Sequence, residues 1–96
     1  MAKKLTPNHP GKHLNEFLAD YGLSKYRLAK DINVPLTRIT TIVDGKRGIT
    51  ADTALRLGRY FGTTAQYWVS LQNNYDIQMT SRAEGKAIEK IKPLAA

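Results

Sequence analysis

Residues 24–43 read SKYRLAKDINVPLTRITTIV, in which apolar residues recur at the spacing of two short helices joined by a tight turn. Ala29 is small at the position where these helices would approach most closely. Asn33 falls at the turn, where its short polar side chain tolerates a left-handed backbone. Pro35 opens the second helix, where a missing N–H does little harm. The pattern predicts a helix-turn-helix with a shared core of Leu28, Ile32, Val34, Ile39 and Ile42.

The second helix of this pair has an unusual outward surface. Once Ile39 and Ile42 turn inward, three threonines remain outside, although β-branching lowers helix propensity. An α-helix fits the major groove of B-DNA, where hydroxyl, guanidinium and apolar side chains contact base edges, thymine methyls and phosphates. An ordinary exposed helix is the alternative. We expect the DNA-reading residues to be Leu36, Thr37, Arg38, Thr40 and Thr41.

Basic residues flank this helix where a DNA backbone would pass. Lys25 lies near the start of the first helix of the pair, and Lys46 and Arg47 follow the second. Phosphate contacts set the register of a protein on DNA and supply salt-dependent affinity. We expect these three side chains to bind phosphates, and the alternative is that each is a solvated surface charge.

Apolar periodicity of the helical kind continues through the chain, and sustained strand-like alternation is absent. Helix starts are marked by residues that cap free N–H groups: Ser24, Thr50 and Thr64. Helix ends are marked by glycines that follow apolar segments: Gly22, Gly45 and Gly62. The fold is therefore predicted to be all-α, with helices near 10–21, 24–31, 35–44, 50–61 and 64–79.

The chain of 96 residues has room for one domain. We predict an N-terminal arm over 1–9, a DNA-binding domain with a dimerising fifth helix over 10–79, and a C-terminal tail over 80–96. Gly85 weakens helix formation in the tail, which is therefore either a short helix or an extended end.

The charge balance favours a polyanionic partner. The chain has 15 Lys and Arg against 8 Asp and Glu, a net charge of +7, and the excess lies mostly in residues 1–48. Double-stranded DNA is the preferred partner and an acidic membrane surface the weaker one, while simple solubility is the alternative. No apolar run approaches a membrane span and no export signal is present, so we expect a cytoplasmic protein without a membrane partner.

Catalytic and metal-binding functions have little support in the sequence. The absence of cysteine excludes disulfides, thiolate zinc sites and a cysteine nucleophile. His9 and His13 lack a third ligand, and the loop at 45–48 is too short and follows no strand, so it is not a phosphate-binding loop. We expect no metal, no cofactor and no enzymatic activity.

A homodimer follows from the reach of one recognition helix. A single helix contacts only a few base pairs, so specificity requires two half-sites about 34–36 Å apart and a twofold dimer. The basic N-terminal half must stay open to DNA, whereas the fifth helix is too aromatic to bury all of its rings in a monomer. We predict a dimer interface at Tyr67, Leu71 and Tyr75, with Trp68 behind them in the core.

Several motifs also carry a family resemblance: HPG at 9–11, GLS at 22–24, GKRGITADTALRL at 45–57, FGTT at 61–64 and IKPL at 91–94. On these motifs, over residues 9–94, the chain resembles XRE-type, lambda-repressor-like helix-turn-helix proteins and, among them, the HigA/VapI-type antitoxins. The resemblance implies a five-helix dimer that binds a palindromic operator, represses its own operon and neutralises an RNA-cleaving, HigB-type toxin. The chain departs from the family pattern at Lys12, Asn33 and Leu36.

Two other functions stay open beside this antitoxin interpretation. One is a stand-alone XRE-family transcriptional regulator without a toxin. The other is a module whose main task is to clamp a toxin, with DNA binding secondary. The net charge of +7 gives no general attraction to a basic toxin, so DNA binding has the firmer support.

Overall fold

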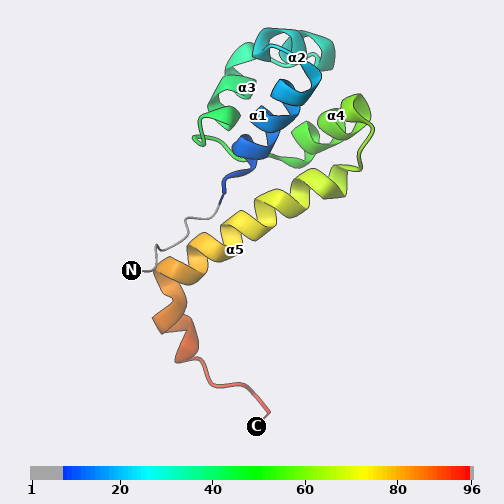
Figure 1. The fold of residues 1–96 in the computed structure, drawn as a ribbon. Coiled ribbons are helices and arrows are strands. Elements are labelled where there is room, and N and C mark those ends of the chain that lie inside the picture. The colour runs from blue at the N-terminus through cyan, green and yellow to red at the C-terminus, as the bar shows by residue number, and fades with distance from the viewer. Residues whose placement is uncertain (1–7, 96) are drawn as a thin grey trace.

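The helices predicted from apolar spacing are present in the computed structural model, which describes residues 8–95. Within this range the chain has no strand and five helices (Figure 1): α1 Pro10–Tyr21, α2 Lys25–Ile32, α3 Leu36–Val43, α4 Ala51–Phe61 and α5 Ala65–Glu89. The all-α prediction is confirmed. Residues 1–7 of the predicted N-terminal arm lie outside the described part.

Short-range capping interactions set most helix boundaries. The side-chain oxygens of Ser24, Thr50 and Thr64 accept hydrogen bonds from N–H groups three residues later, at 2.9, 3.4 and 3.1 Å. These three caps are as predicted, and each helix begins one residue after its cap. Asn33 ends α2 with a φ of 57°, which is the left-handed turn expected there.

Helices α1 and α3 begin in ways that the sequence analysis did not predict. His9 caps α1, because its ring Nδ1 accepts a hydrogen bond from the N–H of Gly11 at 2.9 Å. Pro35 does not open α3 but precedes it as an extended residue with ψ of 144°, so the helix begins at Leu36. Pro35 itself makes no side-chain capping bond, since its ring has no acceptor.

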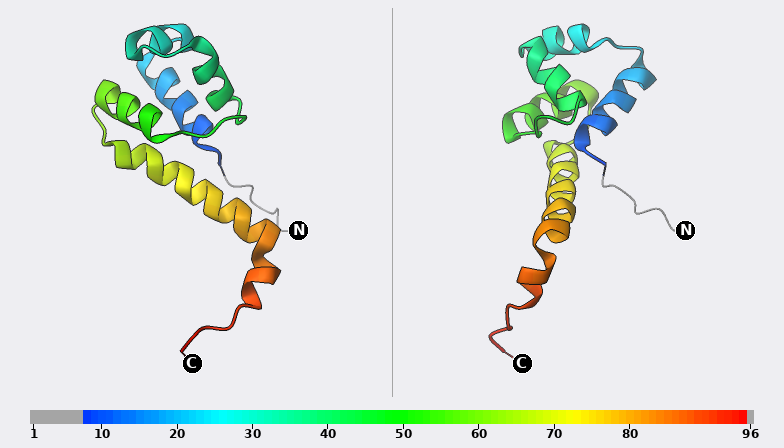
Figure 2. Two further views of the ribbon diagram at one scale, coloured as in Figure 1. Left: turned by 180° about the vertical axis from the view of Figure 1, so that it is seen from behind. Right: turned by 90° about the vertical axis from the view of Figure 1, so that its left-hand side faces the viewer.

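Helix α5 extends about ten residues beyond its predicted end, because it ends at Glu89 rather than near residue 79. The first part of the predicted tail is therefore helical and continuous with α5. Arg82, Ala83, Glu84, Lys86 and Ala87 are good helix formers, and together they outweigh the roughly 1 kcal/mol that one glycine costs. Figure 2 shows α5 running along the bundle of α1–α4 and then projecting beyond it.

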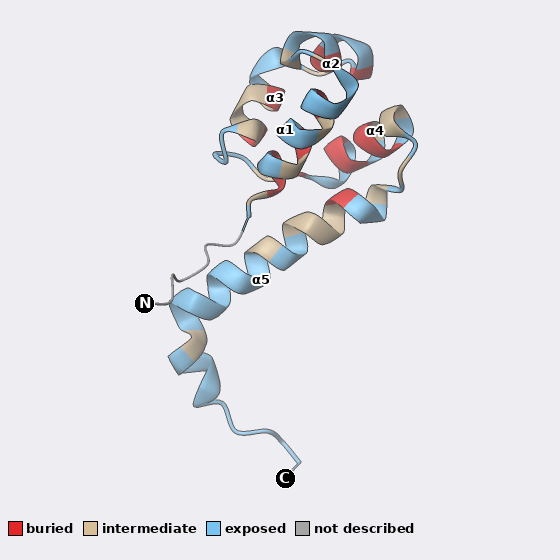
Figure 3. Ribbon diagram, viewed as in Figure 1, coloured by how far each residue is buried: buried red, intermediate tan, exposed pale blue. Residues whose placement is uncertain are grey.

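The hydrophobic core lies where α1–α4 meet the first turns of α5, as the buried segments in Figure 3 show. Trp68 is fully buried, as predicted, and its ring N–H donates to Thr63 Oγ1 at 2.9 Å. Val34 packs against the core from a half-buried position. The buried apolar residues are Leu14, Leu18, Leu28, Ala29, Ile32, Ile39, Ile42, Ile49, Ala54, Leu57 and Trp68.

The part of α5 that projects beyond the core is exposed in Figure 3, and its sequence mixes polar and apolar residues. No helix of residues 8–95 is long and apolar enough to cross a membrane. The exposed length of α5 is therefore a surface element of the fold.

Helix α1 approaches α3 more closely than side chains ordinarily allow. A Cβ atom placed on Gly11 would lie 1.8 Å from the carbonyl oxygen of Ile42. Only a residue without a side chain permits this contact, which brings the backbone at the start of α1 against the last turn of α3.

Asp31 connects α2 to α4 through its carboxylate. The hydroxyl of Tyr60 donates to Oδ2 of Asp31, and Arg27 Nε donates to the same oxygen at 2.7 Å. Both hydrogen bonds favour the ionised carboxylate, that from Tyr60 more strongly, and they hold the pKa of Asp31 below its ordinary value.

Replacing Gly11 by alanine tests the contact between α1 and α3. The added methyl group has no room, so Gly11→Ala is expected to lower the free energy of unfolding by about 1–3 kcal/mol. Gly85→Ala is the control, because Gly85 has open space around it; that change is expected to stabilise the helix by about 0.5–1 kcal/mol. Urea unfolding measures both, and equal effects of the two changes would contradict the close contact.

The bond from Tyr60 to Asp31 predicts a dependence of stability on pH. Above the ordinary aspartate pKa of about 3.9 its stabilising contribution is complete, and it is lost as the pH falls through the lower pKa of the folded chain. Asp31→Asn removes this contribution, so the difference in Tm between wild type and variant is expected to shrink below about pH 4. A difference that stays constant from neutral pH down to about pH 2 would contradict it.

Candidate nucleic-acid interface

Helix α3 presents the residues predicted to read DNA on the face that its core contacts leave open. Ile39 and Ile42 are fully buried, whereas Leu36 is 43% exposed and Thr37 is exposed. Arg38, Thr40 and Thr41 are half-buried on the flanks of the same helix. The structure therefore brings all five predicted positions together on one helix of eight residues.

Thr40 and Thr41 of α3 use their hydroxyl protons within the helix. Thr41 Oγ1 donates to the carbonyl of Thr37 at 2.6 Å, and Thr40 Oγ1 donates to the same carbonyl at 3.1 Å. A hydroxyl has a single proton but two lone pairs. With the proton used, each hydroxyl offers its lone pairs to donors on the bases, and each methyl offers an apolar contact.

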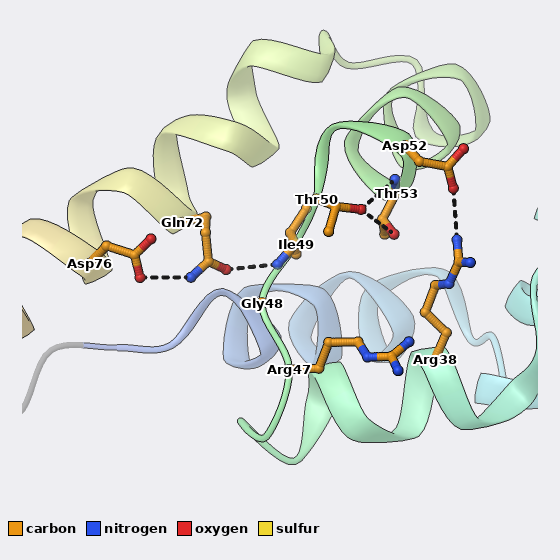
Figure 4. Close-up of a pocket in the computed structure, with 9 residues that line it drawn as sticks. All are labelled: Arg38, Arg47, Gly48, Ile49, Thr50, Asp52, Thr53, Gln72 and Asp76. Atoms are coloured by element: carbon orange, nitrogen blue, oxygen red, sulfur yellow. Dashed lines mark hydrogen bonds and ion pairs between the residues drawn. The ribbon is translucent and has the colours of Figure 1, made fainter.

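Arg38 is held by an acidic residue of the next helix. Its Nη1 donates to Oδ2 of Asp52 at 2.7 Å (Figure 4). Arg56 Nε lies 3.1 Å from the same oxygen. Hydrogen bonds from both arginines, that from Arg38 the stronger, hold the pKa of Asp52 below its ordinary value. The sequence analysis quoted Asp52 only as part of the motif at 45–57 and did not predict this contact.

The loop after α3 is folded back on that helix. The N–H groups of Lys46 and Arg47 donate to the carbonyl of Thr41 at 2.9 and 3.2 Å. Both side chains are exposed, and the Arg47 side chain extends beside Arg38 along a cleft of about 480 Å³ (Figure 4). The structure thus brings the predicted phosphate-binding pair to the edge of α3.

Gln72 of α5 fixes the same loop from the other side. Its Oε1 accepts from the N–H of Ile49 at 2.8 Å, and its Nε2 donates to Asp76 Oδ1 at 3.0 Å (Figure 4). A Cβ atom on Gly48 would lie 3.0 Å from the Gln72 amide, so the loop passes close to α5. The sequence analysis did not predict this bond, because Gln72 and Ile49 are 23 residues apart in the chain.

Lys25 forms a separate part of the predicted interface. It is the first residue of α2 and is half-buried, at the end of that helix opposite the turn at Asn33. The positive end of the α2 dipole lies at the same place, and this adds to the attraction for a phosphate.

The residues predicted to form a dimer contact lie on α5 and also make contacts within the chain. Tyr67 is 39% exposed, with its ring 5.1 Å from that of Trp68. Leu71 packs against the core, and the ring of Tyr75 lies edge-on to that of His9 at 4.9 Å. The more exposed apolar side chains of α5 come after them: Ile77 at 66%, Met79 at 40% and Ile88 at 50%.

The histidines considered for a metal site have other surroundings. His9 caps α1, and burial lowers the pKa of its ring more than nearby Asp76 raises it. His13 lies 3.9 Å from Glu16. Within residues 8–95 no three side chains of the histidine, cysteine or carboxylate type are placed to hold a metal ion.

Comparison with known proteins places this geometry in a family. The Cro/C1-type HTH DNA-binding domain matches residues 13–66. Virulence-associated protein I of Dichelobacter nodosus is 49% identical over 91% of this chain and 81% of that protein. A solved HigA-family antidote protein from Coxiella burnetii has a TM-score of 0.90 and 46% identity, covering 93% of this chain and 99% of that one.

A second solved relative was crystallised with DNA. It is PA4674 of Pseudomonas aeruginosa in complex with its operator, with a TM-score of 0.91 and 44% identity over 97% of this chain and all of that one. The resemblance inferred from the sequence motifs is thereby confirmed. The chain belongs to the Cro/C1-type helix-turn-helix family, in the group of the HigA antitoxins and virulence-associated protein I.

Proposed function

We propose that this chain is a sequence-specific DNA-binding repressor of the HigA antitoxin type that binds a palindromic operator. The observation that carries the proposal is the open face of α3, with its exposed Leu36 and Thr37, bordered by the basic loop at Lys46 and Arg47. Two solved Pseudomonas aeruginosa structures of 44% identity, HigA with the higBA promoter and PA4674 with its operator DNA, support the same function.

In this function α3 lies in the major groove with its N-terminal residues toward the base edges. Leu36 and the threonine methyls contact thymine methyls, and Arg38 donates to guanine or to phosphate. Lys25, Lys46 and Arg47 bind phosphates on either side and fix the register. The chain acts by binding in the cytoplasm, with no catalytic step of its own.

The second part of the proposed function is neutralisation of an RNA-cleaving, HigB-type toxin. A HigA-family antidote protein and the antitoxin HigA-1 of Vibrio cholerae, 27% identical over 82% of this chain, support it. The test is co-expression with a small toxin gene encoded beside this one. Rescue of growth together with co-purification supports the antitoxin, and a solitary gene favours the stand-alone regulator.

The repressor is proposed to act as a homodimer held by α5. Tyr67, Leu71 and Tyr75 are the interface residues expected from the sequence. The exposed side chains of Ile77 and Ile88 add further apolar surface on the part of α5 that leaves the bundle. A contact there leaves the α3 faces of both subunits open to DNA.

The base-reading part of this proposal is tested on α3. Arg38→Ala combined with Thr41→Ala is expected to weaken operator binding by about 1–3 kcal/mol per lost base contact and to leave the fold intact. Gel-shift titration at fixed salt measures the affinity, and circular dichroism checks the fold. Operator affinity equal to that of the wild type would exclude these two residues from recognition.

The phosphate-binding part predicts a change in salt dependence. Replacing Lys46 and Arg47 by alanine is expected to weaken binding to every sequence alike and to reduce the salt slope by roughly one to two units. Alanine at Lys86 and Lys90, which lie near the far end of α5, is the matched control and should leave the slope unchanged. An unaltered slope in the loop variant would show that Lys46 and Arg47 are solvated in the complex.

The dimer is tested by placing a charge on α5. Ile77→Glu is expected to give a folded monomer with greatly weakened operator binding, since Ile77 is 66% exposed and contributes little to the core. Leu55→Glu, at an equally exposed leucine of α4, should remain dimeric. Light scattering gives the mass; a wild-type chain that is monomeric at micromolar concentration yet binds operator tightly would contradict the assembly.

A further inference from the structure

Asp52 is the centre of a polar chain that joins three helices. It lies in the first turn of α4 and accepts from Arg38 of α3 at 2.7 Å. It also accepts from Arg56, whose Nε lies 3.2 Å from Oδ1 and 3.1 Å from Oδ2. One carboxylate therefore pairs with two guanidinium groups on the edge of the proposed DNA-reading surface, and the cluster keeps a net positive charge.

Arg56 is fixed in turn by the end of α2. Its Nη1 donates to the carbonyl of Ile32 at 2.8 Å and contacts that of Asn33 at 3.4 Å. These carbonyls belong to the helix-turn-helix turn itself. The position of the Asp52 carboxylate is thus tied to the backbone that sets the angle between α2 and α3.

The bond to Asp52 restricts the orientation of the Arg38 side chain and leaves most of its N–H donors available. A guanidinium has five N–H donors in a rigid plane, and Asp52 engages Nη1 alone. The Arg38 side chain, which is 28% exposed, is held in one orientation while its other donors stay available. An arginine fixed before binding loses less conformational freedom when it meets a base.

We propose that Asp52, supported by Arg56, is a specificity-determining residue that positions Arg38 for base recognition. This inference rests on the proposed function, because it requires that the chain reads an operator. Non-specific binding needs only positive charge near the phosphates, so it gains nothing from an oriented Arg38. Asp52 is therefore expected to raise the affinity for the operator without raising the affinity for other DNA sequences.

The negative charge of Asp52 and its positioning of Arg38 predict different changes in DNA affinity when Asp52 is neutralised. Asp52 is an anion beside the proposed DNA surface, so neutralising it removes a repulsion and raises the affinity for any DNA. If Asp52 also positions Arg38, its loss lowers operator affinity while non-specific affinity rises. The opposite signs make the two effects separable.

The experiment uses the full chain and two DNA duplexes. One is selected by the wild-type protein from a random-sequence library, and the other is a scrambled duplex of the same length and composition. Asp52→Asn is expected to weaken binding to the selected duplex about tenfold, as for loss of one base contact, and to strengthen binding to the scrambled one. Asp52→Glu, which keeps the carboxylate, is expected to recover part of the selectivity.

Asp44→Asn is the matched control, because Asp44 is an exposed acid at the end of α3. It is expected to raise the affinity for both duplexes by one common factor. In an Arg38→Ala background, Asp52→Asn is expected to act like this control, since the residue it positions is gone. A purely structural role for Asp52 would lower operator affinity with or without Arg38.

The outcomes separate this inference from the proposed function. If Asp52→Asn raises the affinity for both duplexes equally, the positioning role is wrong and the repressor function stands. If the library yields no preferred sequence for the wild-type chain, the proposed function is contradicted and the inference with it. Thermal unfolding of each variant confirms that the compared proteins are folded.

Discussion

Helix α3 has eight residues, too few for a stable helix in water, so its existence and orientation depend on what it packs against. Ile39 and Ile42 supply the buried contacts, and the backbone of Ile42 meets Gly11 at a distance that excludes any side chain. This contact between α1 and α3 sets how far the α3 surface stands out from the bundle. The proposed DNA-reading face is therefore a property of the whole bundle.

Polar contacts then determine how that face is presented. Asp52 holds Arg38 from α4, and Gln72 holds the N–H of Ile49 from α5, so both edges of the surface are fixed by helices outside the helix-turn-helix. The hydroxyls of Thr40 and Thr41 donate to the Thr37 carbonyl, so their protons are used within the helix. In the proposed function the fourth and fifth helices thus contribute to DNA recognition through the residues that they orient.

Local signals in the sequence were sufficient for the helix-turn-helix. The apolar spacing placed Leu28, Ile32, Ile39 and Ile42 in the core, and the caps at Ser24 and Thr64 act over three residues along the chain. Contacts between residues far apart in the chain have no comparable local pattern in the sequence. Gln72 is 23 residues from Ile49 and Arg38 is 14 from Asp52, so only the packing of the helices brings them together.

The length of α5 was missed for a related reason. Gly85 and the polar residues around it offer little to a core, and a helix that leaves the bundle shows no amphipathic pattern directed at its own domain. The high helix propensity of the residues around Gly85 keeps this segment helical. In the proposed homodimer, the exposed isoleucines along this extension belong to the surface that meets the second subunit.

The most direct test of the account is methylation protection of the selected duplex by the bound wild-type chain. Dimethyl sulfate reacts with guanine N7 in the major groove and with adenine N3 in the minor groove. The account predicts protection of guanine N7 in two half-sites about one helical turn apart, with adenine N3 still reactive between them. Protection confined to adenine N3, or to a single half-site under tight binding, would contradict a dimer that reads DNA with α3 in the major groove.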